Sequence, residues 1–310
     1  MRRSALPDNL LRRTFTTKTA DAAGVSNGRT RAKDLIRVSR GILVPDGVPL
    51  HGAAALAAYT EANPASVLSH LSAARLWGIP LPPRQQGDWR IHLANPPSNA
   101  APRRVNVVGH RLTFARGEIW KLDGVRLTGA ARTWLDLAAL LSWQELVAAG
   151  DFLVCSHGAG FPVPRQSVCS IDDLVRVAAS HPGYRGLRNA RAALELIRVG
   201  ADSPPETAMR LELVAAGLPE PELNVVVHDE EGRPRLWPDG AYRQYSISLQ
   251  YDGDHHNGPE QYLRDMRRLE TTKMLGWEEI RLGRNDLTGE HPTVVHKVAN
   301  ALRAKGWKPQ

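Results

Sequence analysis

The residues best suited to chemistry lie within positions 237–256, where acidic and polar side chains flank a short strand-like run. Asp239 directly follows a proline, and Gln250, Asp252 and His256 come after the apolar run at positions 245–249. Hard divalent cations take oxygen ligands that rigid strands hold a few ångströms apart. This layout therefore predicts a metal site that acts on phosphate esters.

Each of these residues has a second interpretation. Asp239 is the best candidate metal ligand, but Pro-Asp-Gly is also a turn signature. Gln250 offers only a neutral oxygen, which weakens Mg²⁺ binding relative to a carboxylate. Asp252 shares a strand face with Gln250 by the period of two, so it either supplies the missing charge or fixes the following turn. His256, or its neighbour His255, is suited to moving a proton, whereas paired turn histidines on the surface are the alternative.

The composition indicates a globular protein with a polyanionic partner. The chain has 310 residues, of which 42% are hydrophobic and 23% charged, with a net charge of +8. A basic surface steers toward nucleic acid. No apolar run approaches the ~20 residues that cross a bilayer, and no secretory signal is visible, so a cytoplasmic protein without membrane contact is expected. Cys155 and Cys169 form no CxxC pair, which argues against a zinc site or a disulfide.

Residues 14–44 have the pattern of a small winged helix. A helix over 18–23, capped by Thr16-Thr17, is followed by the Gly24 turn, a second helix over about 28–35 and a hairpin. The second helix and hairpin carry five cations that we expect to meet DNA phosphates. These are Arg29, Arg31, Lys33, Arg37 and Arg40. The alternative is a helix pair and hairpin whose charges are only solvated.

This segment resembles the winged-helix domain of AbiEi-type antitoxins, the regulators of type IV toxin–antitoxin systems. The resemblance rests on Phe15-Thr16-Thr17, Ala22-Ala23-Gly24-Val25-Ser26 and Arg37-Val38-Ser39-Arg40-Gly41-Ile42, and it continues weakly through residues 68–78 and 127–138. It implies a DNA-reading or autoregulatory module without enzyme chemistry, and a toxin protein encoded nearby as a partner.

The middle of the chain is predicted to be an α+β connector. Helices are expected over 64–78, 130–152, 171–180 and 187–199, with strands around 89–93, 105–112 and 125–127. His70, His92 and His110 are scattered along this region. They are expected to be packed or surface histidines rather than metal ligands.

The last third is predicted to fold as αβββαβα around a mixed sheet. This order resembles the PD-(D/E)XK nuclease core, and more closely its Vsr-like branch of mismatch-repair endonucleases. The resemblance covers about residues 200–305. Asp239 corresponds to the first aspartate of the pattern, and residues 250–256 to the next motif, with Gln250 replacing glutamate. Asp265-Met266-Arg267-Arg268 and the strand opened by Gly276-Trp277 match the remainder.

The resemblance implies Mg²⁺ or Mn²⁺ as cofactor, with Asp239, Gln250 and Asp252 as ligands and His256 as the proton carrier. Glu206 would join this site, although Ser203-x-x-Glu206 also reads as a capping box. Arg268 and Lys273 would contact DNA phosphates, and an ion pair between Asp265 and Arg268 is the structural alternative.

Together these patterns predict an α+β protein of three domains. Residues 1–60 form a winged-helix DNA-binding domain, 61–200 an antitoxin-like connector, and 201–310 a Vsr-like endonuclease domain. The predicted function is DNA binding with metal-dependent hydrolysis of phosphodiester bonds. The alternative is a non-catalytic antitoxin-like transcriptional regulator whose degenerate nuclease fold only binds DNA, and a protein-interaction scaffold is a weaker third. Gln250 leaves the enzyme assignment open.

Overall fold

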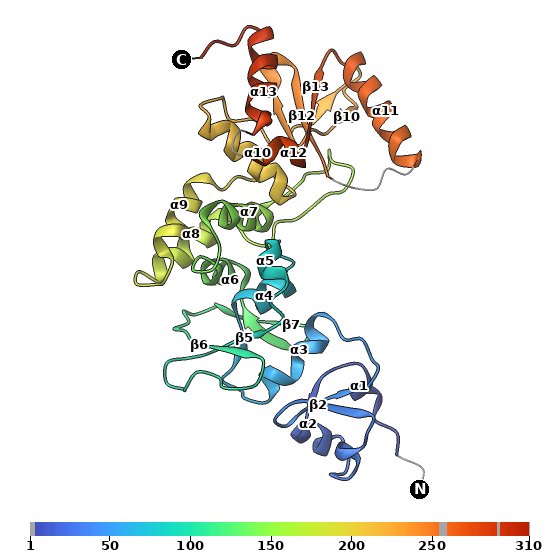
Figure 1. Cartoon of the computed structure of the whole chain (residues 1–310), viewed down its shortest axis with the longest axis vertical. Coiled ribbons are helices and arrows are strands. Elements are labelled where there is room, and N and C mark those ends of the chain that lie inside the picture. Colours follow the sequence, from blue (N-terminus) through green and yellow to red (C-terminus); the bar gives the residue numbers. More distant parts are fainter. Residues whose placement is uncertain (1–3, 254–258, 290–291, 310) are drawn as a thin grey trace. The chain divides into compact units, whose positions relative to one another are not determined.

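A computed structural model describes residues 4–253, 259–289 and 292–309, and for 259–265 the backbone alone. The chain forms two compact units, Met1–Leu137 and Ala138–Gln310 (Figure 1). Among the helices of the described residues, none is long and apolar enough to span a membrane.

The first unit opens with a three-stranded antiparallel sheet in the order β1-β3-β2. Its elements are α1 (Asp8–Leu11), β1 (Phe15–Thr16), α2 (Thr17–Ala22), β2 (Leu35–Ser39) and β3 (Ile42–Pro45). The predicted cap of α2 is confirmed, because the Thr16 hydroxyl accepts a hydrogen bond from the Thr19 amide at 2.9 Å. The predicted second helix is wrong, since only a 3₁₀ turn, Arg29–Arg31, forms there. That segment contains one large apolar residue, Leu35, which is too little to hold a helix against a core.

A five-stranded mixed sheet in the order β6-β5-β4-β8-β7 makes the rest of the first unit. Its strands are β4 (Val67–Leu68), β5 (Ile91–Asn95), β6 (Val107–Arg111), β7 (Ile119–Leu122) and β8 (Val125–Thr128). The helices are α3 (Gly52–Glu61), α4 (His70–Trp77), α5 (Pro83–Gln86) and α6 (Ala130–Leu137). The three strands predicted here are present, whereas the helix predicted over 64–78 begins only at His70. Leu68 pairs with both Leu93 and Leu127, and all three are buried in the core.

The second unit begins with three helices, α7 (Trp143–Val154), α8 (Ile171–Ser180) and α9 (Leu187–Leu196). The single helix predicted over 130–152 is instead two, α6 and α7. The cause is a capping box, in which Ser142 accepts from the Glu145 amide at 3.3 Å and Glu145 accepts from the Ser142 amide at 2.8 Å. That reciprocal pair starts a new helix.

The remainder of the second unit is a mixed sheet enclosed by helices. The strand order is β11-β12-β13, with β11 antiparallel and β13 parallel to β12, and a separate pair β10-β9. The strands are β9 (Val227–His228), β10 (Pro234–Leu236), β11 (Gly240–Tyr242), β12 (Ile247–Asp252) and β13 (Glu278–Gly283). The helices are α10 (Pro204–Ala215), α11 (Pro259–Met274), α12 (Arg284–Leu287) and α13 (Thr293–Ala304).

The two faces of β12 have different surroundings. Ile247 and Leu249 enter the core together with residues of α10 and α13. Because strand side chains alternate, Ser248, Gln250 and Asp252 point to the other face. The predicted α+β class with a mixed sheet is confirmed. The division into three domains at residues 60 and 200 stays a prediction.

Candidate functional site

Asp239 lies between β10 and β11 and is tied to the end of β12. Its amide donates to the Leu249 carbonyl at 3.1 Å. Its carboxylate Oδ2 accepts from the Gln250 side-chain amide at 2.8 Å and from the Tyr251 backbone amide at 2.7 Å. The Pro-Asp-Gly segment therefore holds a carboxylate against the strand end, as a metal ligand requires. Gln250 adjoins that carboxylate through its nitrogen.

Glu206 lies in the first turn of α10 and is buried. Its carboxylate accepts from the Asp202 amide at 2.8 Å and from the Ser203 hydroxyl at 2.7 Å. The predicted capping box needs correction, because the glutamate bonds to the amide one residue before Ser203. Ser203 is extended at φ −139°, and Pro204 follows it with no amide hydrogen.

The carboxylates of Asp239 and Glu206 are near enough for their negative charges to repel each other. The pKa of Asp239 is raised to about 7 by two causes together. Burial is the larger, and the negative charge of the Glu206 carboxylate is the smaller. The Tyr251 hydrogen bond and the Arg268 charge oppose the rise without cancelling it. Burial also raises the pKa of Glu206. A carboxylate whose pKa lies near neutrality, beside a second carboxylate, is typical of a functional site.

Asp252 lies on the same face as Gln250 but is held by arginines. Its carboxylate oxygens lie 3.8 Å from Arg268 and 3.8 Å from Arg281. Both arginines also contact the carboxylate of Glu279, which is 1% exposed, at 3.1 and 2.7 Å. Four alternating charges thus form a closed group on β12, β13 and α11. The sequence reasoning assigned no site role to Glu279 and Arg281, although both lie in the strand that Gly276-Trp277 opens.

The remaining predicted residues of this site are spread more widely. Arg268 belongs to the group just described, and its described partners are Glu279 and Asp252. Lys273 is exposed in the last turn of α11. His256, its neighbour His255 and the side chain of Asp265 lie outside the described part of the chain. Their predicted roles stay predictions.

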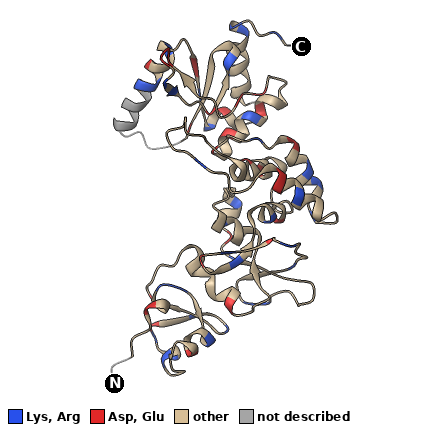
Figure 2. Ribbon diagram, turned by 180° about the vertical axis from the view of Figure 1, so that it is seen from behind, with Lys and Arg blue, Asp and Glu red and all other residues tan. Residues whose placement is uncertain are grey.

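The predicted DNA-contacting cations of the first unit differ in exposure. Arg31, Lys33, Arg37 and Arg40 are exposed. The guanidinium of Arg29 instead donates to both carboxylate oxygens of Asp34 at 2.9 and 2.8 Å and to the Ser4 carbonyl, with its side chain 8% exposed. Lys and Arg residues occur along both units (Figure 2). The 3₁₀ turn and the hairpin of β2 and β3, with the segment between them, therefore offer four exposed cations.

A cluster that the sequence reasoning missed lies next to Glu206. His157 Nε2 lies 2.6 Å from Asp202, whose amide hydrogen-bonds to Glu206. Cys155 Sγ lies 3.3 Å from Asp202 and 3.6 Å from His157. Arg165 donates to Asp202 at 2.6 Å. Burial raises the pKa of Cys155 to about 12, so this buried thiol is protonated and packs as a polar core group. Cys155 and Cys169 are both free thiols.

The comparisons with known proteins find relatives that are named as uncharacterized. Residues of this chain are 26% identical over 214 positions to two proteins of Mycobacterium tuberculosis, Uncharacterized protein MT2308 of strain CDC 1551 / Oshkosh and Uncharacterized protein Rv2248 of strain ATCC 25618 / H37Rv. Each alignment covers 68% of this chain and 73% of the relative. No family model matches the sequence. No solved structure matches it significantly.

Proposed function

We propose that the protein binds DNA and that its second unit hydrolyses phosphodiester bonds with Mg²⁺ or Mn²⁺. The observation that carries this proposal is the carboxylate of Asp239, whose pKa is raised to about 7 by burial and by Glu206. A divalent cation relieves such repulsion, and carboxylate oxygens are the ligands that it prefers. Asp239 and Glu206 would hold the ion, with the side-chain oxygen of Gln250 as a neutral third ligand after its amide turns.

The ion would supply charge stabilisation at the phosphate and a lowered pKa for attacking water. The chain's own groups perform the positioning. The Tyr251 amide fixes Asp239 Oδ2 at the end of β12. Arg268 and Arg281 hold Asp252 beside the site. His256, which the sequence analysis selected, is the proposed carrier of the proton.

A second candidate is a non-catalytic, antitoxin-like regulator that only grips DNA, with a toxin protein as its partner. One observation favours it. The Gln250 nitrogen already donates to Asp239 at 2.8 Å, so a neutral group occupies the place where the nuclease pattern has a second anion. With Asp252 held by arginines, the site has fewer carboxylates than a two-metal centre needs.

Incubating supercoiled plasmid with the purified chain and Mn²⁺ tests the proposal. Nicked or linear product that chelation abolishes supports hydrolysis. Intact plasmid together with tight, salt-sensitive DNA binding selects the second candidate. Absence of DNA binding at low salt would contradict both and leave a protein-interaction scaffold.

The proposed DNA contact of the first unit predicts a change in salt dependence. Replacing Arg31, Lys33, Arg37 and Arg40 by alanine should weaken binding to a duplex, because each lost phosphate contact reduces counterion release. The slope of log K against log salt should shrink by about 0.9 per contact. Fluorescence anisotropy across salt concentrations measures it. Arg29→Ala is the matched control, since this arginine is engaged with Asp34 and should leave the slope unchanged.

A further inference from the structure

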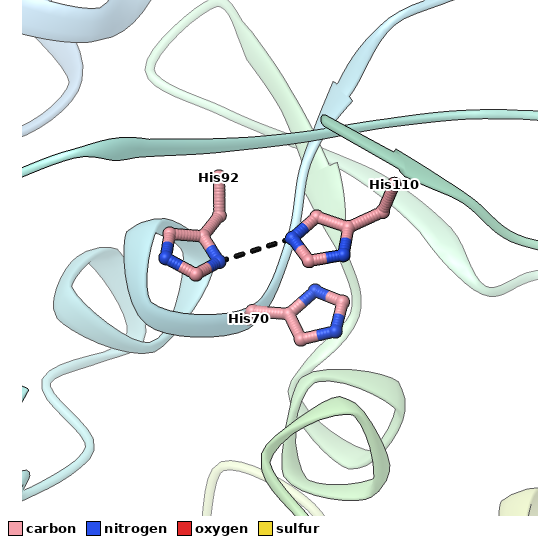
Figure 3. A group of neighbouring side chains, drawn as sticks. All are labelled: His70, His92 and His110. Carbon is pink, nitrogen blue, oxygen red and sulfur yellow. Dashed lines mark hydrogen bonds between the residues drawn. The ribbon is translucent and has the colours of Figure 1, made fainter. Parts of the chain in front are cut away.

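Three histidines that are far apart in sequence meet in the first unit. His70 opens α4, His92 lies in β5, and His110 lies in β6. One nitrogen of each ring lies within 4.8 Å of a nitrogen of both others. Figure 3 shows the three rings side by side, with a hydrogen bond between His92 and His110. Strand pairing and the α4 turn thus bring together three residues that are far apart in sequence, and His70 and His92 are buried, within the expectation of packed or surface histidines.

The backbone builds this arrangement. In the parallel pair of β5 and β6, His92 is opposite Val108 and His110 is opposite Ala94, so the two histidines are diagonal neighbours on one face. The Ser69 amide donates to the His92 carbonyl at 3.1 Å, and the His92 amide donates to the Ser72 hydroxyl at 2.9 Å. These bonds fix the start of α4 against β5. His70 itself adopts φ +46°, a conformation that is uncommon for a residue with a Cβ and often marks a functional position.

The distances suit a shared ion. His92 Nδ1 lies 3.1 Å from His110 Nε2, near the roughly 3.3 Å between two nitrogens of a tetrahedral zinc site with bonds of about 2.0–2.1 Å. The His70 and His110 rings are stacked, with centroids 3.8 Å apart and planes 15° from parallel. A metal lies in the plane of its imidazole ligand, so one of these two rings must turn when an ion binds.

Two carboxylates and one arginine lie near the cluster. Arg132, whose positive charge acts on His70, forms ion pairs with Asp136 at 2.9 Å and with Glu118 at 2.7 Å. That group therefore carries one net negative charge.

Hydrogen bonding leaves part of the cluster unsatisfied. His70 Nδ1 has the Ser69 hydroxyl at 2.9 Å, and His92 Nδ1 has His110. His92 Nε2 is buried and has no hydrogen-bond partner among the described residues. Packing alone gives no reason to bury a polar nitrogen in this way, since an unsatisfied buried group costs about 1–3 kcal/mol. Rotation of the ring about its side-chain bonds would let either nitrogen meet an ion.

We propose that His70, His92 and His110 form a three-histidine site for a zinc-class transition ion. Imidazole nitrogens favour zinc, copper, nickel and iron over magnesium, whose preference is for oxygen. Three protein ligands leave a fourth position for water or an exogenous ligand. This site belongs to the first unit and is independent of the proposed hydrolysis.

Titration of the chelator-stripped full chain with Co²⁺ and Zn²⁺ tests the site. Tetrahedral Co²⁺ should produce visible absorption bands that Zn²⁺ then displaces. Loss of one of three ligands in His110→Gln should weaken Zn²⁺ binding by more than about 100-fold, because loss of an outer-shell partner alone costs about 10–100-fold. His110 is only half-buried, so this variant should fold, and circular dichroism checks that it does.

Two matched variants locate the ion. His157→Gln removes the histidine of the Cys155 cluster, and His228→Gln removes an exposed histidine; both should bind Zn²⁺ like the unaltered chain. A near-ultraviolet thiolate-to-cobalt band that His157→Gln abolishes would place the ion at Cys155 and overturn the proposal. Unchanged affinity in folded His110→Gln would overturn it as well, as would absence of Zn²⁺ binding by the unaltered chain.

Discussion

Asp239→Ala is expected to reduce Mn²⁺-dependent plasmid cleavage by about 100-fold or more, because losing a metal-held carboxylate removes several kcal/mol of charge stabilisation. Asp239 is the group that two donors fix at the end of β12 and whose pKa burial and Glu206 raise to about 7. Initial rates of nicking on supercoiled plasmid, compared at equal protein concentration, measure the effect.

Two further variants make this comparison specific. Asp172→Ala removes an exposed aspartate of α8 in the same unit and should leave the rate unchanged. Gln250→Glu restores the carboxylate that the nuclease pattern has and should increase Mn²⁺ affinity. Cleavage that persists in Asp239→Ala would remove this residue from the proposed site. Cleavage that appears only in Gln250→Glu would favour the non-catalytic candidate for the natural chain.

Arg210→Ala is expected to destabilise the second unit by about 3–5 kcal/mol, because it leaves a buried carboxylate without its cation. Arg210 is 1% exposed and lies 2.8 Å from the Asp151 carboxylate, which is equally buried. It also donates to the Leu196 carbonyl at 2.8 Å and to Glu220 at 3.0 Å. Asp151 in turn accepts from Thr207, the residue after Glu206. This network therefore holds α10, and with it Glu206, against α7.

Denaturant unfolding followed by circular dichroism measures this loss. Arg198→Ala is the matched control, since Arg198 also contacts Glu220, at 3.1 Å, but its side chain is 41% exposed. An exposed pair contributes about 0–1 kcal/mol, so this variant should change little. Equal losses in the two variants would show that burial of Arg210 does not determine its contribution.

Much of the fold could be predicted from local signals. Thr16, Gly78 and Gly276 mark helix boundaries that the structure reproduces within a residue or two. The errors fall where packing outweighs local pattern. The basic segment after Gly28 has charge but little apolar surface, and it forms a turn in place of a helix. β11 was missed because three residues carry no measurable periodicity.

The candidate site was predictable only in part, for a physical reason. Asp239 and Gln250 are close in sequence, and Asp239 directly precedes β11, the strand that pairs with β12 of Gln250, so a motif could join them. Glu279 and Arg281 come from a parallel partner strand, and Asp202 meets His157 across a long separation. The three histidines likewise meet through strand pairing. Without a pattern in sequence, tertiary contacts of this kind leave no local signal.

The most direct test of the proposed metal site compares the stability of the unaltered chain and Asp239→Asn at pH 5 and pH 8, with and without Mn²⁺. The pKa of Asp239 is raised in the folded state to about 7, from an ordinary value of 3.8. As the pH rises from 3.8 to about 7, the unfolded chain loses a proton that the folded chain keeps, so the stability of the folded chain falls progressively across this range. Asparagine keeps an oxygen acceptor without the charge.

Without Mn²⁺, Asp239→Asn should gain about 2–3 kcal/mol of stability relative to the unaltered chain between pH 5 and pH 8, because only the unaltered chain carries the raised pKa. With Mn²⁺ at pH 8, the unaltered chain should gain stability as the ion binds its folded state, while the variant should gain much less. Equal stabilisation of both proteins by Mn²⁺, or none of either, would contradict a metal site at Asp239.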